Sequence, residues 1–314
     1  MEKDKTLGSS FPAEEKIFFS LKEALISPEK TTRLDLHYKK LDQVPDEIFQ
    51  LKNLKELILI NNNIKEFPKR LRELKDLKKL DLSGNSLESV PDEIGDLENL
   101  TSLVLSWNDL EQLPDSIGNL KKLKWLGLNH NKLRTLPETI GNLKDLEVLV
   151  VSENHLTSLP DSLGNLKNLI KLRISTNHLE SLNDSICKLE NLKKLDAQVN
   201  NISDLPDCIG DLQSLEKLRL YKNMLTSLPE NIGRLSNLEK LLIHNNELRN
   251  LPDSIGELSK LEEFDISFND FYELPENIKK LENLDNLWLR RNNFSEDKKE
   301  TISKLLPNTR IVWS

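Results

Sequence analysis

The histidines are the first residues whose type and spacing suggest chemistry. His155 and His178 stand at equivalent positions of two similar segments, and Glu153 and His130 belong to the same surface. If each segment adds one parallel strand, the two imidazoles lie about 5 Å apart, and two imidazoles with a carboxylate could hold zinc. These positions are variable and lie on the surface, so nothing in the sequence orients the three side chains toward a common metal ion. We therefore favour a structural interpretation and expect no metal and no other cofactor.

The two cysteines, Cys187 and Cys208, are the remaining candidates for nucleophilic chemistry. A nucleophilic thiol needs a neighbouring base, and both cysteines fall in the half of their segments opposite to the histidines. Two cysteines also cannot provide the framework of a disulfide-built scaffold. No Gly-rich phosphate loop or Ser/His/Asp grouping stands out in the sequence, so we expect a protein that is not an enzyme.

Charge and hydropathy limit the possible partners. The 314 residues carry a net charge of -8, whereas a protein that binds nucleic acid normally has a basic balance. The apolar residues near the N-terminus are interrupted by Ser20, Lys22 and Glu23, so neither a signal peptide nor membrane insertion is predicted. As written, the chain is expected in the cytoplasm, although a secreted protein whose leader had been removed would look the same.

A 23-residue period organises the chain and must position any functional residue. Residues 100–122 read LTSLVLSWNDLEQLPDSIGNLKK, residues 123–145 read LKWLGLNHNKLRTLPETIGNLKD, and the general form is LxxLxLxxNxLxxLPxxIGxLxx. We expect an N-terminal tail and capping helix over 1–30, about 12 such units over 31–294, and a C-terminal cap of a helix and a final strand over 295–314.

This pattern resembles the leucine-rich repeat proteins, in the short class whose units contain LPxxIGxL in their second half. That class is found in bacteria, spirochaetes included, and in Ras-pathway and cell-polarity scaffolds of eukaryotes. The resemblance implies an α/β solenoid shaped like a horseshoe, with a parallel sheet on the concave side and short helical or 3-10 turns and loops on the convex side. It implies binding rather than catalysis.

The physics of the unit leads to the same fold. LxL places two leucines on one side of a short strand, and a single strand cannot bury them, so units must stack. The amide of the recurring asparagine can satisfy backbone groups of its own turn and of the next unit. A proline followed by an acid suits the first positions of a short helical turn and its dipole. We therefore assign these residues to architecture.

Both ends of the repeat array are expected to be capped. Residues 14–26 suit an amphipathic helix that ends before Pro28. Ser295 is a good N-cap for a second helix, which Pro307 would stop, and residues 309–313 could form a strand over the last open edge. The two ends therefore look finished, and we expect a complete chain that is a monomer.

One pair of units departs from the pattern. Asn183 replaces the proline, Cys187 replaces the glycine, and Ala197 replaces a core leucine or valine. Losing that much buried side chain could cost a few kcal/mol, which predicts a soft seam near the middle of the array. Drift of the repeat and a hinge would both explain the seam, and drift is the simpler interpretation.

The third, fifth, seventh and eighth positions of each unit vary and form the candidate binding face. In the first half of the array they are unexpectedly apolar, and two of the four tryptophans lie there. Such a patch is typical of an interaction hot spot, although β-branched residues also simply suit strands. The candidate anchors are Trp107, Trp125, His130, Ile58, Ile60, Val104, Val148 and Val150.

Farther along, the same face becomes basic. A basic stretch in an acidic protein could steer an acidic partner into the curve, but a stripe of solvated lysines would look the same. The stripe is short and has a single aromatic, which disfavours nucleic acid. The residues expected to orient a partner here are Arg173, Arg219, Tyr221 and Lys222.

We therefore expect a non-catalytic module that binds a protein partner through the concave face; the sequence does not identify that partner. Three alternatives remain open. One is recognition of a glycan or cell-wall fragment, which surface tryptophans and asparagines also suit. Another is the substrate-recognition part of a ubiquitin-ligase-like bacterial effector whose catalytic domain is absent here. The third is a purely structural scaffold with no dedicated hot spot.

Overall fold

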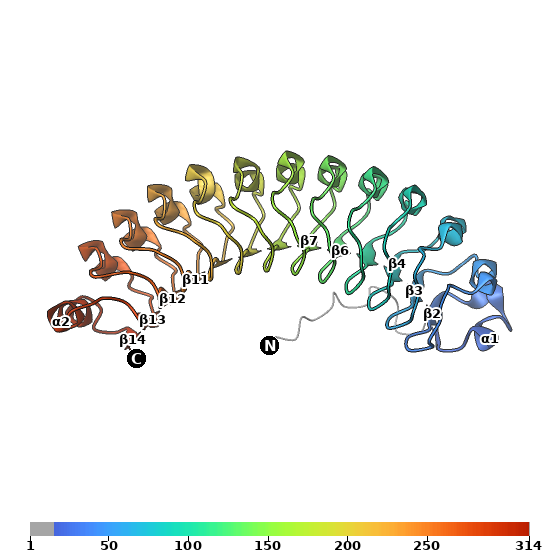
Figure 1. Ribbon diagram of the computed structural model, residues 1–314, viewed down its shortest axis with the longest axis horizontal. Coiled ribbons are helices and arrows are strands. Elements are labelled where there is room, and N and C mark those ends of the chain that lie inside the picture. Colours follow the sequence, from blue (N-terminus) through green and yellow to red (C-terminus); the bar gives the residue numbers. More distant parts are fainter. Residues whose placement is uncertain (1–15, 314) are drawn as a thin grey trace.

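A computed structural model describes residues 16–313 of the chain. They form a curved solenoid in which a parallel sheet lines the concave side and 3-10 helices stack along the convex side (Figure 1). The sheet has 14 strands in chain order, each paired with the next. This is the α/β solenoid that the repeat predicts.

Each regular unit contributes one three-residue strand to this sheet, and shorter or separate strands complete its two ends. The strands are β1 (Ile17–Phe18), β2 (Arg33–Asp35), β3 (Glu56–Ile58), β4 (Lys79–Asp81), β5 (Ser102–Val104), β6 (Trp125–Gly127), β7 (Val148–Val150), β8 (Lys171–Arg173), β9 (Lys194–Asp196), β10 (Lys217–Arg219), β11 (Lys240–Leu242), β12 (Glu263–Asp265), β13 (Asn286–Trp288) and β14 (Arg310–Val312).

The register carries each position of the repeat straight across the sheet. Ser102 pairs with Trp125, and Trp125 pairs with Val148, so third-position residues form one column and fifth-position residues such as Gly127 form another. We call these the third column and the fifth column. Residues at the eighth position, just after the strands, are called the eighth column.

The fourth and sixth positions of each unit face the interior, because side chains alternate along a strand. In the unit of β6, Leu126 and Leu128 are fully buried, and Ile140 and Leu143 of the convex half belong to the same hydrophobic cluster. Stacking of the units joins these groups into one core that runs along the solenoid.

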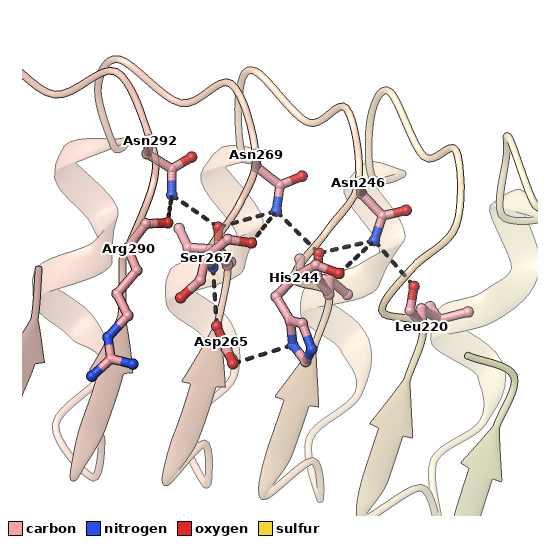
Figure 2. Close-up of polar contacts among 10 residues, drawn as sticks. Leu220, His244, Asn246, Asp265, Ser267, Asn269, Arg290 and Asn292 are labelled. Carbon is pink, nitrogen blue, oxygen red and sulfur yellow. Dashed lines mark hydrogen bonds and ion pairs between the residues drawn. The ribbon is translucent and has the colours of Figure 1, made fainter. Parts of the chain in front are cut away.

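The repeated asparagine ties neighbouring units together. Asn131 Nδ2 donates to the carbonyl oxygens of Leu105 and Leu128, both at 3.0 Å, and Asn131 Oδ1 accepts from the backbone N–H of Leu110 at 3.0 Å. Figure 2 shows the same amide donors in three later units. The architectural role predicted for this residue is confirmed, but the neighbouring unit that it contacts is the preceding one and not the next.

The convex half of each unit contains a short 3-10 helix. In most units the proline is the N-cap, so the acid, rather than the proline, takes the first helical position. These helices are η1 (Pro28–Lys30), η2 (Asp46–Gln50), η3 (Lys69–Glu73), η4 (Asp92–Asp96), η5 (Asp115–Asn119), η6 (Glu138–Asn142), η7 (Asp161–Asn165), η8 (Asp184–Lys188), η9 (Asp207–Asp211), η10 (Glu230–Arg234), η11 (Asp253–Glu257) and η12 (Glu276–Lys280).

The glycine of the repeat allows successive 3-10 helices to approach closely. A Cβ on Gly141 would lie 2.4 Å from the carbonyl oxygen of Ser162 in the next unit. At one step, Cys187 replaces this glycine and Cys208 replaces the serine, and the two form a disulfide with their Cα atoms 5.8 Å apart. Neither cysteine is therefore a free thiol, and the units flanking the expected seam are cross-linked on the convex side.

The N-terminal end differs from the sequence prediction. The helix expected over residues 14–26 is reduced to α1 (Leu21–Ala24), and Ile17–Phe18 instead forms the edge strand β1 beside β2. Pairing satisfies backbone groups along the open edge of β2, whereas so short a helix has little stability of its own. Residues 14 and 15 lie outside the described part of the chain.

The C-terminal end consists of one helix and one strand. Helix α2 (Glu296–Leu305) begins after Ser295, whose side chain accepts a hydrogen bond from the backbone N–H of Lys298 at 3.4 Å. Strand β14 then pairs with β13 and covers that edge of the sheet. The ring of Trp313 packs edge-on against Phe294, with centroids 5.7 Å apart.

Candidate functional site

A groove of about 980 Å³ runs along the concave face from β3 to β10. Its lining comes from residues of the strands and the positions beside them, so the sheet register fixes where each side chain lies. Seven of the residues selected from the sequence line this groove: Ile58, Ile60, Val104, Trp125, Val150, Arg173 and Arg219.

Trp125 and Gly127 shape the middle of the groove. Both belong to β6, at the third and fifth columns. A Cβ on Gly127 would lie 3.4 Å from Trp125 Nε1 and 3.2 Å from Val104 Cγ1. The missing side chain therefore leaves room for the half-buried indole beside Gly127, whose neighbours in the fifth column are Val104 and Val150.

Strand β7 is the most buried part of this region. Val148 and Val150 are each 9% exposed, and all three residues of the strand are buried. The apolar patch is thus less exposed than the sequence suggests at these two positions. Val150 contributes to the floor of the groove, whereas Val148 does not line it.

An ion triad marks the end of the groove toward β10. Asp196, in the fifth column of β9, has a side chain only 4% exposed. Its Oδ2 accepts from Arg173 Nε at 3.0 Å, and its Oδ1 accepts from Arg219 Nη1 at 2.9 Å. A buried carboxylate requires such partners, and two guanidinium groups on one carboxylate leave a net charge of about +1 by formal counting.

Trp107 lies apart from Trp125, at the rim where the strands end. It belongs to the eighth column, has a left-handed backbone (φ 57°) and is 58% exposed. Its ring stacks on that of His130 with centroids 3.4 Å apart, and His130 Nδ1 lies 2.8 Å from a carboxylate oxygen of Glu153. Of the two tryptophans chosen as joint anchors, only Trp125 lines the groove, and neither Trp107 nor His130 does.

A similar arrangement recurs five units later. Tyr221 stacks on His244 with centroids 4.4 Å apart, and His244 Nδ1 lies 3.1 Å from Asp265 Oδ2 (Figure 2). Burial raises the pKa of Asp265, but the contact with His244 and the hydrogen bonds from Ser267 outweigh it, so the pKa lies below its ordinary value. The sequence analysis did not select His244, although its 23-residue spacing from Tyr221 indicates the contact.

Lys222 and the remaining histidines lie outside the groove. Lys222 is an exposed eighth-column residue with φ 55°. The rings of His155 and His178 stack in parallel with centroids 5.6 Å apart. Within residues 16–313, no group of three or more His, Cys, Asp or Glu side chains could hold a metal ion.

The third column contains a basic residue that sequence reasoning missed. Lys217 of β10 pairs in register with Lys194 of β9 and with Lys240 of β11. Reading the third position of every unit at the 23-residue spacing would have found it. Together with Lys171 of β8, these side chains form a continuous row of four lysines beside the ion triad.

The repeat geometry defines the class of the molecule as a solenoid built from strand and 3-10 helix units, with a groove on its sheet. A family model described as a leucine-rich repeat region matches residues 69–152, 115–200 and 178–310, and a second, described as leucine rich repeat, matches residues 29–87. The chain belongs to the leucine-rich repeat family.

Solved structures give the same result. A leucine-rich repeat protein of Leptospira interrogans is 32% identical, with 95% of this chain and 100% of that one covered and a TM-score of 0.59. An internalin of Listeria monocytogenes is 24% identical, with 91% and 81% covered and a TM-score of 0.81, which supports the fold. A search of curated proteins gives no match.

A plant receptor ectodomain is a third similar structure. The ectodomain of the receptor kinase GASSHO1/SCHENGEN3 of Arabidopsis thaliana, in complex with CASPARIAN STRIP INTEGRITY FACTOR 2, is 29% identical with a TM-score of 0.57. The match covers 86% of this chain and 40% of that one. Separately, none of the helices described in this chain is both long and apolar enough to cross a membrane.

Proposed function

We propose that this protein is a non-catalytic binding module that holds a segment of a partner protein in the groove on its concave face. The observation that carries the proposal is the groove itself, because its floor brings Val104, Trp125 and Val150 together on the concave face. Apolar and aromatic side chains at the centre of a concave surface supply most of the affinity in protein interfaces.

The side chains of the third and fifth columns are not those that form the core of the solenoid. The leucines and asparagines that stabilise the solenoid occupy other positions of the unit, so the third and fifth columns vary without disturbing the core. The similar plant ectodomain is solved in complex with CASPARIAN STRIP INTEGRITY FACTOR 2, and we take a polypeptide as the first class of ligand to test.

A displayed library of random twelve-residue peptides provides the test. Purified protein is used for selection, and the enriched peptides are then measured by fluorescence anisotropy against Val104→Asp, which places a charge on the groove floor. Since a buried or half-buried charge facing an apolar ligand costs several kcal/mol, we expect at least a tenfold loss of affinity. Met224→Asp, at an exposed apolar residue that does not line the groove, is the matched control and should bind as the wild type does.

Circular dichroism and urea unfolding would first establish that both variants are folded. Peptides that bind Val104→Asp as well as the wild type would contradict the proposal, as would a selection that enriches no peptide. If the protein bound glycans on an array and this binding depended on Val104, the ligand of the groove would be a carbohydrate and not a protein.

A further inference from the structure

The second half of the concave face concentrates positive charge in a protein whose net charge is -8. The third and fifth columns of β8 to β11 contain six cations and one carboxylate, Asp196, whereas the same columns of β5 to β7 contain no charged residue. We call the six cations the basic surface: Lys171, Arg173, Lys194, Lys217, Arg219 and Lys240.

The two middle lysines of the row, Lys194 and Lys217, are electrostatically unfavourable neighbours in the described part of the chain. Strand pairing places Lys194 directly beside Lys171 and Lys217, and neighbouring strands are about 4.8 Å apart. Like charges directly opposite each other destabilise a sheet. Lys240 has a carboxylate partner, Glu263 at 2.6 Å, but Lys194 and Lys217 form no ion pair with any residue between 16 and 313.

Asp196 holds the two arginines of the basic surface in place. Its two oxygens bind one guanidinium group each, from the strands on either side. The arginine side chains remain 26% and 27% exposed. A fixed guanidinium loses little rotamer freedom when it binds a carboxylate, so this arrangement is preorganised for an acidic ligand.

The basic surface is continuous with the apolar floor, because Arg173 and Arg219 line the same groove as Val104 and Trp125. We propose that an acidic stretch of the partner segment binds the basic surface while apolar residues of the same segment occupy the floor over β5 to β7. The inference rests on the proposed function, since it describes which segment the groove takes.

The spacing of the strands gives the expected sequence of such a segment. Trp125 in β6 and Lys194 in β9 are three strands apart, which is roughly 14 Å at about 4.8 Å per strand. An extended chain that crosses the strands advances about 3.3 Å per residue. The acidic residues should therefore begin about four residues from the apolar ones.

A polypeptide fits this surface better than a nucleic acid does. The cations adjoin an apolar floor that a phosphate backbone would leave empty, and the ring of Tyr221 is already stacked against His244. The overall negative charge of the protein also repels a long polyanion. A short acidic peptide avoids most of that repulsion.

The test uses a fluorescein-labelled peptide of eight glutamates and measures anisotropy at low salt. Lys194→Gln combined with Lys217→Gln removes two charges and breaks no ion pair with a described residue, so the chain should fold normally. We expect about tenfold weaker binding, the sum of two exposed charge contacts. The control is Lys75→Gln combined with Lys144→Gln. These two exposed lysines occupy the same position of their respective units and lie outside the groove, so this variant should bind within about twofold of the wild type.

Equal binding of octaglutamate by the Lys194/Lys217 variant and the wild type would overturn the inference. A twelve-nucleotide single strand of DNA that binds as tightly, with the same sensitivity, would also overturn it in favour of nucleic acid. The peptide library distinguishes a failure of this inference from a failure of the proposed function. If the selected peptides depend on Val104 but have no acidic residues about four positions from their apolar ones, the groove still binds peptides, and only the acidic stretch is contradicted.

Discussion

The two halves of the concave face share one backbone and differ only in their side chains. The fifth column reads Val104, Gly127 and Val150 over β5 to β7, and then Arg173, Asp196 and Arg219 over β8 to β10. The register is the same in both halves, and the fourth position of each unit is a buried leucine in both. The solenoid therefore separates stability from recognition: the fourth and sixth positions maintain the fold, while the third and fifth can change from apolar to charged.

The unit that carries Asp196 shows that this separation has a limit. Its core position is the small Ala197, its concave face contains the ion triad, and its convex side carries Cys208 of the disulfide. The basic half thus depends on contacts that the apolar half does not contain. Removing those contacts should distinguish the two halves by stability as well as by ligand.

The largest effect is expected from Asp196→Ala. This change leaves Arg173 and Arg219 facing each other without the carboxylate between them, and breaking a buried ion pair from one side costs about 3–4 kcal/mol. Urea unfolding followed by circular dichroism measures the loss. Val104→Ala, in the same column of the apolar half, serves as the control and should cost about 1 kcal/mol. Equal losses would show that the triad adds nothing to the stability of the basic half.

A smaller effect is expected from removing the disulfide on the convex side of the basic half. Cys187→Gly combined with Cys208→Ser restores the Gly–Ser step of the other units but removes the cross-link. A disulfide that closes a loop of this size contributes about 2–3 kcal/mol, so the urea midpoint should fall despite the restored pattern. Reductant should lower the midpoint of the wild type and leave that of the double variant unchanged. A double variant as stable as the oxidised wild type would mean that the link only replaces lost packing.

Most of the fold follows from the 23-residue period, whereas part of the candidate site does not. The columns and the repeated asparagines depend only on the 23-residue spacing, so aligning the units of the sequence locates them. The separation of Trp107 from Trp125 depends on the left-handed turn after each strand, and the disulfide depends on the distance between helices of successive units. The strand at Ile17–Phe18 was missed because an open sheet edge overrides local helix preference.

The eighth column offers a finer comparison of the two halves. Trp107 and Val199 both adopt a left-handed backbone, with φ 57° and 58°, which is unfavourable for side chains other than glycine and asparagine. Val199→Asn should stabilise the chain by about 0.5–1 kcal/mol in thermal unfolding. Trp107→Asn gains the same backbone relief but loses the stack on His130, so its net change should be close to zero. A destabilised Val199→Asn would indicate that valine makes a contact worth more than the strain.

The last comparison concerns two aspartates that flank these halves at the same position of the repeat. Asp81 and Asp265 both lie in the fifth column, and each accepts a hydrogen bond from the backbone N–H of the serine two residues later, at 2.9 and 3.0 Å. Burial, together with the charge of Asp35 two strands away in β2, raises the pKa of Asp81 above its ordinary value despite its hydrogen bonds from Ser83. The pKa of Asp265 is lowered, since His244 and Ser267 outweigh burial there.

Opposite pKa shifts require opposite dependences of stability on pH. Asp265 contributes stability that is complete above the ordinary aspartate pKa and is lost as the pH falls through the lower folded value. Asp81 does the reverse: the folded chain keeps its proton longer, so stability falls as the pH rises from the ordinary pKa to the raised one. Asp265→Asn should therefore be destabilising at about pH 5.5 and less destabilising at about pH 3. Asp81→Asn should become more stable than the wild type over the same rise in pH. The urea midpoints of both variants and the wild type at the two pH values test this contrast. If the stability of both variants relative to the wild type changed in the same direction with pH, the contacts from neighbouring units would not determine how a fifth-column aspartate affects stability.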